Sequence, residues 1–321
     1  MPRPVVLLVP LLLAGPAAAV DLAFPVACTP GTDCYLQNLF DHDPGPGARD
    51  AACGPLAYDG HDGTDIALPT LADQRRGVDV LAAAPGVVLG TRDGMPDIPQ
   101  GGPDSPDVTG VECGNGVVLA HEDGWQTQYC HMAQGSVAVR EGETIAAGQR
   151  LGRIGLSGDT EFPHLHLTVR QGDTAVDPFA PEASGTCGAL PDRTLWADPP
   201  AFPQGGVTDA GFATAVPAYD IIRAGTADAP PAPDQPLVLF GLLFGGRVGD
   251  EVSLDITGPD GVAVLSHAEP LDRTQALLFR AAGLRPPRGG WPPGRYEGTV
   301  MLRRDGAEVG RFAASTEMPP G

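Results

Sequence analysis

The sequence of 321 residues contains no lysine, and its 20 basic residues are outnumbered by 40 acidic ones, which gives a formal net charge of −20. An acidic surface repels polyanions, so nucleic-acid binding through a basic patch is excluded. None of the six cysteines belongs to a C-x-x-C pair, which argues against a cysteine zinc site and a thioredoxin-like redox motif. No apolar run reaches the roughly 18 residues needed to span a membrane. We therefore expect no nucleic-acid partner and no transmembrane segment.

The first 19 residues have the layout of a secretory signal peptide. One positive charge at Arg3 precedes an apolar run over residues 5–13, and small residues follow up to Ala19. The run is too short for a membrane anchor and is interrupted by Pro10 and followed by Pro16. All six cysteines lie after this segment, and their even number indicates an oxidising compartment. These features predict a secreted protein, in a Gram-negative periplasm rather than in the extracellular medium.

The positions of the cysteines indicate structural disulfides. Cys28, Cys34 and Cys53 crowd into the stretch before residue 58, so we expect disulfides to tie this N-terminal segment to the domain that follows. Cys113 and Cys130 flank a predicted hairpin, which makes them a plausible pair. Six cysteines permit fifteen connectivities, so the sequence alone leaves the pairing open.

Short apolar runs between turn residues predict an all-β protein. Glycine and proline together make up about a quarter of the chain. Between them recur runs rich in Val, Leu and Ile, and no helical period is sustained. We expect an antiparallel β domain with its N-terminal segment over residues 20–189, in which the acidic stretch 92–110 is an inserted loop, more consistent with a solvated excursion than with a calcium site.

A second domain is predicted towards the C-terminus. Residues 190–234 are rich in alanine and proline and indicate a linker. Residues 235–321 contain the alternating run VSLDI before the turn GPDG, and a later pair of strand patterns separated by an Asp-Gly turn at residues 305–306. Repeated short strands of this kind predict an immunoglobulin-like sandwich. It contains no cluster of His, Asp or Cys, so we expect no chemistry there.

Two short motifs bring together residues typical of a metal site. In the strand-like segment PHLHLTVR, His164 and His166 are two residues apart and point to the same face. In the glycine-rich segment YDGHDGTDIALP, His61 and Asp65 are four residues apart. Either motif alone occurs commonly on a solvated surface. Together they offer two imidazoles and a carboxylate, the ligand count of a catalytic zinc with a fourth position left for water.

The order of these motifs resembles that of the LytM/lysostaphin-type zinc metallopeptidases, which hydrolyse peptidoglycan cross-links and have the duplicated hybrid motif fold. The family pattern H-x-G-x-D, a strand ending in His, Y-x-H and H-x-H is matched by HDGTD (61–65), GVVLAH (116–121), YCH (129–131) and HLH (164–166). The intervening stretch REGETIAAGQRLGRIGLSG is also similar to the family. The resemblance covers residues 58–178 and does not reach the C-terminal domain.

The resemblance implies a role for each matching residue. His61, Asp65 and His166 would bind Zn²⁺, and His131 and His164 would flank the reacting water. His131 is the candidate general base and His164 the candidate oxyanion stabiliser, an assignment the sequence leaves open. His121 corresponds to a position that is usually not a ligand, and we expect a structural role for it. The acidic insertion and the residues DTEFP before the H-x-H motif depart from the family pattern and would border the groove.

The sequence therefore predicts a secreted zinc endopeptidase that cuts stem peptides or cross-bridges of peptidoglycan. One alternative is an inactive LytM-like regulator of other wall hydrolases, although such proteins generally lack some of the ligands. Another is a zinc peptidase that acts on proteins. Neither the bond that is cut nor any protein partner follows from the sequence.

Overall fold

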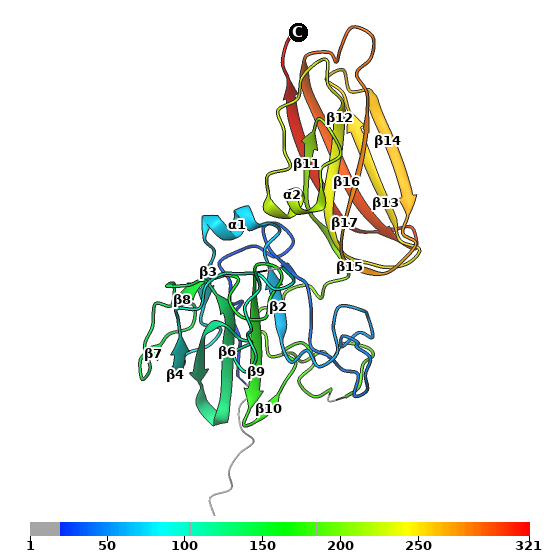
Figure 1. Cartoon of the computed structure of the whole chain (residues 1–321). Helices are drawn as coiled ribbons and strands as arrows, with labels where there is room; N and C mark the ends of the chain where they lie inside the picture. The colour runs from blue at the N-terminus through cyan, green and yellow to red at the C-terminus, as the bar shows by residue number, and fades with distance from the viewer. Residues whose placement is uncertain (1–19, 103, 184) are drawn as a thin grey trace, which may run out of the picture.

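The computed structural model describes residues 20–102, 104–183 and 185–321. These form two bodies, each built on antiparallel sheets, with few helical residues (Figure 1). The predicted all-β antiparallel fold class is confirmed. The predicted signal peptide, residues 1–19, lies outside the described residues. No helix in the described part of the chain is long and apolar enough to cross a membrane.

The first body contains an antiparallel sheet that crosses the middle of the domain. Its strand order is β1-β2-β9-β6-β5-β4-β7, and β10 pairs with β9. Strands β3 and β8 form a separate pair. The bounds are β1 Tyr35–Leu36, β2 Thr64–Ala67, β3 Asp79–Leu81, β4 Gly86–Arg92, β5 Asn115–Ala120, β6 Trp125–Met132, β7 Thr144–Ile145, β8 Arg150–Arg153, β9 His164–Gln171 and β10 Thr174–Ala175. A 3-10 turn, Glu122–Gly124, joins β5 to β6.

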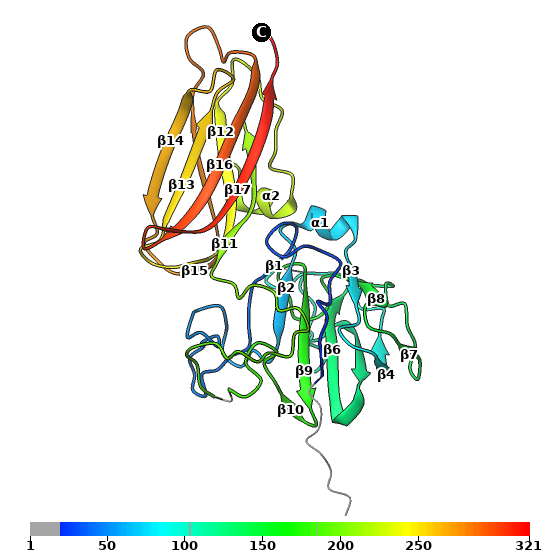
Figure 2. The same ribbon diagram turned by 180° about the vertical axis from the view of Figure 1, so that it is seen from behind.

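The alternating pattern of β9 separates a core face from a polar face. Leu165, Leu167 and Val169 are buried in the domain core, because every second side chain points into it. The histidines of the same strand therefore lie on the opposite face, as the spacing predicts. Figure 2 shows β9 between β2, which carries Asp65, and β6, which carries His131.

Two sheets form the second body. One has the order β11-β12-β15 and the other β14-β13-β16-β17, and their apolar residues share one core. The bounds are β11 Gly206–Ala213, β12 Leu237–Gly246, β13 Glu251–Thr257, β14 Ala263–Pro270, β15 Gln275–Leu284, β16 Gly294–Arg304 and β17 Ala307–Met318. The predicted hairpins are both present, as β13–β14 and β16–β17. The arrangement is a β-sandwich, and its likeness to immunoglobulin domains stays a prediction.

The predicted linker over residues 190–234 contains regular structure from residue 206 onward. Strand β11 lies in this range and pairs with β12 along most of its length, so it belongs to the sandwich. Helix α2, Tyr219–Ala224, also lies there. The alanine- and glycine-rich composition of β11 gives a weak strand signal, and pairing and burial in the sandwich core compensate for it.

Several contacts pack the two bodies together. Phe244 of β12 lies in the core of the first body, with its ring centroid 4.6 Å from that of Tyr35. Helix α2 lies beside α1, Leu71–Arg76, at the junction seen in Figures 1 and 2. Arg75 Nη2 of α1 donates a 3.0 Å hydrogen bond to the carbonyl oxygen of Ala224 at the end of α2.

Three disulfides use all six cysteines. The predicted Cys113–Cys130 pair is present. Cys53 pairs with Cys187, which ties the N-terminal segment to the chain that follows the last strand of the first body. The expectation that the other early cysteines do the same is wrong, because Cys28 and Cys34 pair with each other and close a local loop.

Candidate metal centre and groove

The candidate metal centre lies where β2 and β9 run side by side. In their antiparallel register Asp65 is opposite His166, so both side chains project from the same face of the sheet. His61 reaches them from the glycine-rich turn before β2. Gly63, inside the HDGTD motif, has no room for a side chain, because a Cβ there would lie 2.7 Å from the imidazole of His166 and 2.6 Å from the carbonyl oxygen of Leu167. The motif glycine thus lets the turn approach β9 closely.

Three ligand atoms form a compact triangle. His61 Nε2 lies 3.1 Å from Asp65 Oδ1 and 3.1 Å from His166 Nδ1, and the last two atoms are 2.9 Å apart. Tetrahedral zinc with bonds of about 2.0–2.1 Å separates its ligand atoms by roughly 3.3 Å, so these edges are near the required size. The donor set of two imidazole nitrogens and one carboxylate oxygen suits zinc. The residues present therefore fit the metal that the sequence predicts.

Neighbouring groups orient each of the three side chains. His61 Nδ1–H donates to the carbonyl oxygen of Leu39 at 2.6 Å, which leaves the lone pair of Nε2 for a metal. His166 Nε2 lies 3.0 Å from the Thr168 hydroxyl, which leaves Nδ1. The amide of Asn38 donates to the second carboxylate oxygen of Asp65 at 2.9 Å. Such partners fix the tautomer and direction of metal ligands.

The electrostatics of the triangle favour a positive charge at its centre. Burial works to raise the pKa of Asp65, but the imidazoles of His164 and His61 outweigh it and hold the pKa well below its usual value. Burial works to lower the pKa of His166, but hydrogen bonds and charges from Asp62 and Asp65 raise it to about 9. Without a metal, a proton on His166 supplies this charge. A divalent cation would displace that proton, so metal binding should weaken as the pH falls.

His131 and His164 lie beside the triangle, with their ring centroids 4.6 Å apart. His131 Nδ1–H donates to the carbonyl oxygen of Ser157 at 2.9 Å, and His164 Nδ1 lies 3.0 Å from the carbonyl oxygen of Phe162. Each ring thus directs Nδ1 to the backbone. Nε2 of His164 lies 3.4 Å from Asp65 Oδ1, at the edge of the triangle. Burial lowers the pKa of His131 well below its ordinary value, and the imidazoles of His164 and His166 lower it further. A neutral His131 is able to accept a proton.

The backbone holds His131 in an uncommon conformation. Its φ is 60°, in the left-handed region. Its N–H donates to the carbonyl oxygen of Cys113 at 2.8 Å, and its own carbonyl oxygen accepts from Gly155 at 2.9 Å. These bonds, with the adjacent Cys113–Cys130 disulfide, place the ring at the end of β6.

Two cavities meet at this cluster and share Tyr58 and Asp159 in their walls. The first, of about 340 Å³, contains His131 and His166 and extends over β6 and β9. The second, of about 550 Å³, contains His164 and extends to the second body. An extended chain laid through both cavities would pass the triangle.

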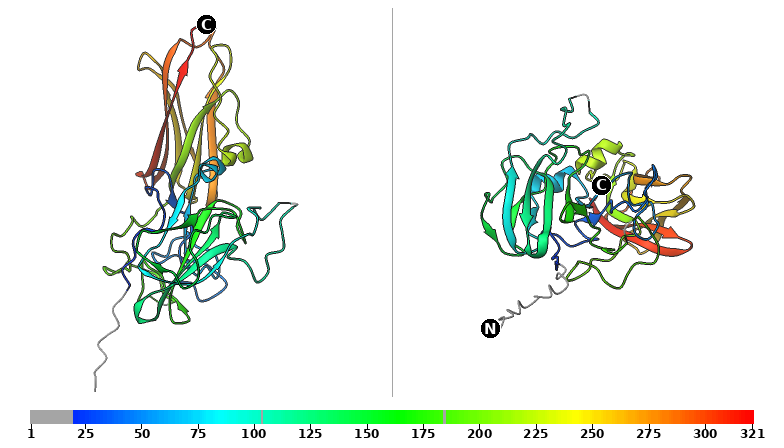
Figure 3. Two further views of the ribbon diagram at one scale, coloured as in Figure 1. Left: turned by 90° about the vertical axis from the view of Figure 1, so that its left-hand side faces the viewer. Right: turned by 90° about the horizontal axis from the view of Figure 1, so that it is seen from below.

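The two departures from the family pattern differ in their relation to the groove. Asp159, Thr160, Glu161 and Phe162, from the stretch before the H-x-H motif, line the second cavity, whereas none of the described residues of the acidic insertion lines either cavity. The insertion extends from the domain in Figure 3. The backbone N–H of Gln100 donates to the carbonyl oxygen of Thr160 at 2.8 Å, and Asp97 Oδ1 accepts from the N–H of Leu156 at 2.7 Å. The insertion is therefore bound to the segment that precedes the H-x-H motif.

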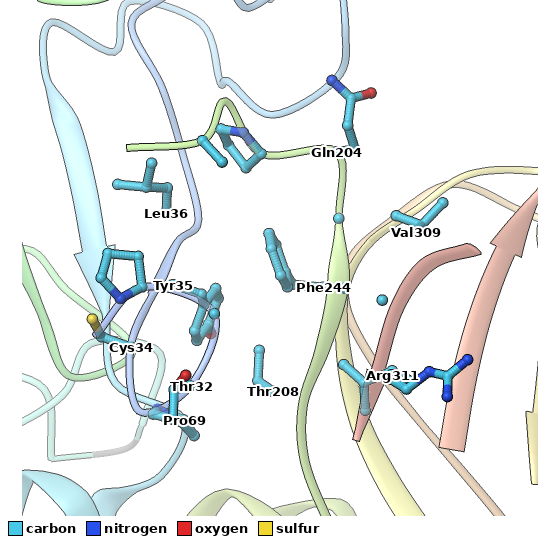
Figure 4. Close-up of a pocket in the computed structure, with 18 of the residues that line it drawn as sticks. Thr32, Cys34, Tyr35, Leu36, Pro69, Gln204, Thr208, Phe244, Val309 and Arg311 are labelled. Carbon is cyan, nitrogen blue, oxygen red and sulfur yellow. The ribbon is translucent and has the colours of Figure 1, made fainter. Parts of the chain in front are cut away.

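His121 and a cavity between the two bodies lie apart from the triangle. His121 contacts the carbonyl oxygen of Pro85 and the hydroxyl of Thr127, at 2.7 and 2.8 Å, which is a structural role. A cavity of about 420 Å³ lies beside the contact between Tyr35 and Phe244 and is lined by residues of the N-terminal segment and of the second body (Figure 4). None of the histidines of the motifs lines it.

Sequence reasoning missed several residues that shape the site. Asn38, Asp62 and Ser157 contact the motif side chains, and Arg223 of the second body lines the second cavity. Asn38 and Arg223 have no recognisable spacing with the histidines. Asp62 lies inside the HDGTD motif, next to His61, and the sequence offers it only as an alternative ligand. The similarity of GLSG at residues 155–158 to a family motif pointed to the segment that contains Ser157.

Residues 59–178 match the family described as Peptidase family M23. The cell division protein DipM of Caulobacter vibrioides is 35% identical over 68 residues, which are 21% of this chain and 11% of that protein. The peptidoglycan DD-endopeptidase ShyA of Vibrio cholerae is 31% identical over 109 residues, 34% of this chain and 20% of that protein. The matched segments span at most a fifth of these two curated relatives. A mutant catalytic domain of the M23 protein EnpA from Enterococcus faecalis is 25% identical, with 44% of this chain and 88% of that chain covered and a TM-score of 0.30.

Proposed function

We propose, from the match of residues 59–178 to peptidase family M23, that the chain is a zinc metalloendopeptidase that hydrolyses peptide cross-links of bacterial peptidoglycan. The observation that carries the proposal is the ligand triangle of His61, Asp65 and His166, which has near-tetrahedral edges and two histidines beside it. An inactive regulator has no need to preserve all five side chains in this geometry. The complete set favours an enzyme.

The three ligands would hold zinc, and His131 and His164 would act on the substrate. Zinc at this position would polarise the scissile carbonyl and lower the pKa of water towards neutrality. His131, neutral and with Nε2 unengaged, takes the proton of the attacking water. His164, with Nδ1 3.0 Å from the carbonyl oxygen of Phe162 and Nε2 on the side of the triangle, would stabilise the oxyanion as charge develops. The two cavities hold the peptide on either side of the cleaved bond.

One relative and the two cavities support the proposed substrate class. ShyA is described as a peptidoglycan DD-endopeptidase, and cavities on two sides of the triangle give room for a peptide that extends past it. The disulfides and the sequence at residues 1–19 support export to an oxidising compartment, with the periplasm as the proposed site of action.

Digestion of purified sacculi tests this proposal and separates its alternatives. We expect the zinc-loaded protein to release peptides whose masses correspond to opened cross-links, a chelator to abolish the release, and added zinc to restore it. Casein digested in parallel reports a peptidase that acts on proteins. Intact sacculi and intact casein, with a full equivalent of zinc bound, would contradict the enzyme and favour a regulator.

A further inference from the structure

The second body forms one wall of the cavity next to His164. The cavity of about 550 Å³ is lined from the first body by Tyr58, Asp159 and His164, and from the second body by Tyr219 and Arg223 of α2 and by Ala276 and Leu277 of β15. Leu277 also packs against the core of the first body. The wall is therefore part of the same packed structure as the site. The C-terminal domain, in which the sequence predicts no chemistry, thus contributes to the wall of the site.

Arg223 presents a guanidinium group to this cavity. Its Nη1 donates to the hydroxyl of Tyr219 at 3.3 Å, and its Nη2 donates to the carbonyl oxygen of Glu161 at 3.1 Å. The guanidinium also lies over the Tyr219 ring, 5.7 Å from its centroid. Within the described residues, no carboxylate lies within 4.0 Å of it. Its charge is thus held in place by neutral groups.

The position of Arg223 is fixed by the contact between α1 and α2. Gly225 ends α2 with a φ of 70°, and a Cβ there would lie 2.6 Å from the Thr70 hydroxyl and 2.7 Å from the Ala72 methyl group. Arg75 donates a hydrogen bond to the carbonyl oxygen of Ala224. Because the end of α2 is seated on the first body in this way, the guanidinium is pre-organised beside the groove.

The distribution of charge along the groove makes Arg223 the cation available to an anionic peptide in the second cavity. On the other side of the triangle, the arginine lining the first cavity, Arg170, is paired with Asp62 at 3.0 Å. The second cavity contains the acidic side chains of Asp159 and Glu161, and Arg223 is the basic residue of its lining. A peptide with free carboxylates is repelled by these acids and by a protein of net charge −20, unless one cation receives it.

We infer that Arg223 binds a carboxylate of the peptide substrate in the second cavity, so that the C-terminal domain selects substrates by charge. The inference rests on the proposed function for its choice of peptide. The planar guanidinium is suited to paired hydrogen bonds with a carboxylate. Through the carbonyl oxygen of Glu161, the same side chain touches the segment whose Phe162 ring stacks on His164 at 4.4 Å, so a bound carboxylate lies close to the reacting groups.

Binding of matched peptides tests the inference without depending on turnover. The probes are synthetic stem tetrapeptides, one with free carboxylates and one with the same carboxylates as carboxamides. The full chain with zinc is titrated with each by calorimetry. We expect the free-carboxylate peptide to bind roughly 10- to 100-fold more tightly, although the net charge of the protein alone favours the amidated one. Arg223→Gln should bring the ratio to one or below, and Arg223→Lys should restore part of it.

Arg295→Gln is the matched control, because Arg295 is an exposed arginine of the same domain that pairs with Glu297 and lines neither cavity. It should keep the wild-type ratio. An unchanged preference in Arg223→Gln, or the absence of any preference in the wild type, would overturn the inference. A purely structural role of Arg223 would weaken both peptides equally and leave the ratio unchanged, which also overturns it. Failure to digest sacculi would instead refute the proposed function and leave the binding ratio to decide this point.

Discussion

Replacing Gly114 by alanine should reduce catalysis without removing the metal. Gly114 has a φ of 65°, and a Cβ there would lie 2.3 Å from the carbonyl oxygen of Ser157. That oxygen accepts the Nδ1–H of His131, so its displacement moves the ring that we propose as general base. The ligands His61 and His166 make no contact with Ser157 among the hydrogen bonds of the site.

The size of the effect follows from the clash. Ordinary van der Waals contact begins at 3.4 Å, so the two segments must separate on the order of 1 Å, a misplacement that costs about 10²-fold in rate at an active site. The left-handed backbone adds about 1 kcal/mol to the loss of stability, and the overpacking adds roughly 1–3 kcal/mol. Activity should fall strongly while the protein stays folded at room temperature if its reserve is the usual 5–15 kcal/mol.

Gly110→Ala is the control for the cost of placing alanine in the left-handed backbone conformation. Gly110 has a φ of 77°, and a Cβ there meets no atom within 4 Å. This variant should lose only about 1 kcal/mol of stability and keep its turnover. The assay combines kcat on a cross-linked peptide, zinc content and thermal unfolding for both variants. Full activity in Gly114→Ala would refute the role of the Ser157 carbonyl, and loss of zinc with activity would show that the metal ligands depend on this segment.

Three further perturbations have defined outcomes. Asn38→Ala removes the donor that orients the ligand carboxylate and should weaken zinc binding about 10- to 100-fold in a chelator competition; unchanged affinity would contradict this orientation role. Burial works to lower the pKa of His42, but Asp177 at 2.8 Å raises it. The difference in unfolding free energy between the wild type and Asp177→Asn should therefore be largest below about pH 6.5 and decline as the pH rises through the raised pKa of His42. Urea unfolding in which this difference grew with pH would refute the prediction. Replacing both Cys53 and Cys187 by alanine opens a loop with a sequence separation of 134 and should lower the free energy of unfolding by about 5 kcal/mol. An unchanged Tm in calorimetry would contradict this.

The sequence was most informative where function requires several residue types in a set order. The alternation of β9 predicts that His164 and His166 share a face, and antiparallel pairing with β2 then places Asp65 opposite His166. This geometry could be anticipated because the period of a strand is fixed. The Cys113–Cys130 pair could be proposed for a similar reason, since both residues flank one hairpin.

The sequence was least informative about contacts between segments without a pattern. Strand β11 has the sequence GVTDAGFA, in which glycine and alanine mask the strand signal, so its place in the sandwich depends on pairing with β12. Arg223 lies in this same proline- and alanine-rich region, and only the packing of α2 on α1 places it beside the groove. Asn38 is a single loop residue with no spacing relation to Asp65.

Metal content measured beside kinetics on five alanine variants tests the central claim most directly. Replacing His61, Asp65 or His166 leaves two protein ligands, so zinc and activity should be lost together. Replacing His131 or His164 removes a group that acts on the water or the oxyanion, so zinc should remain at one equivalent while kcat falls by about 10²-fold or more. Zinc retained at full stoichiometry in Asp65→Ala, or lost in His131→Ala, would contradict the account.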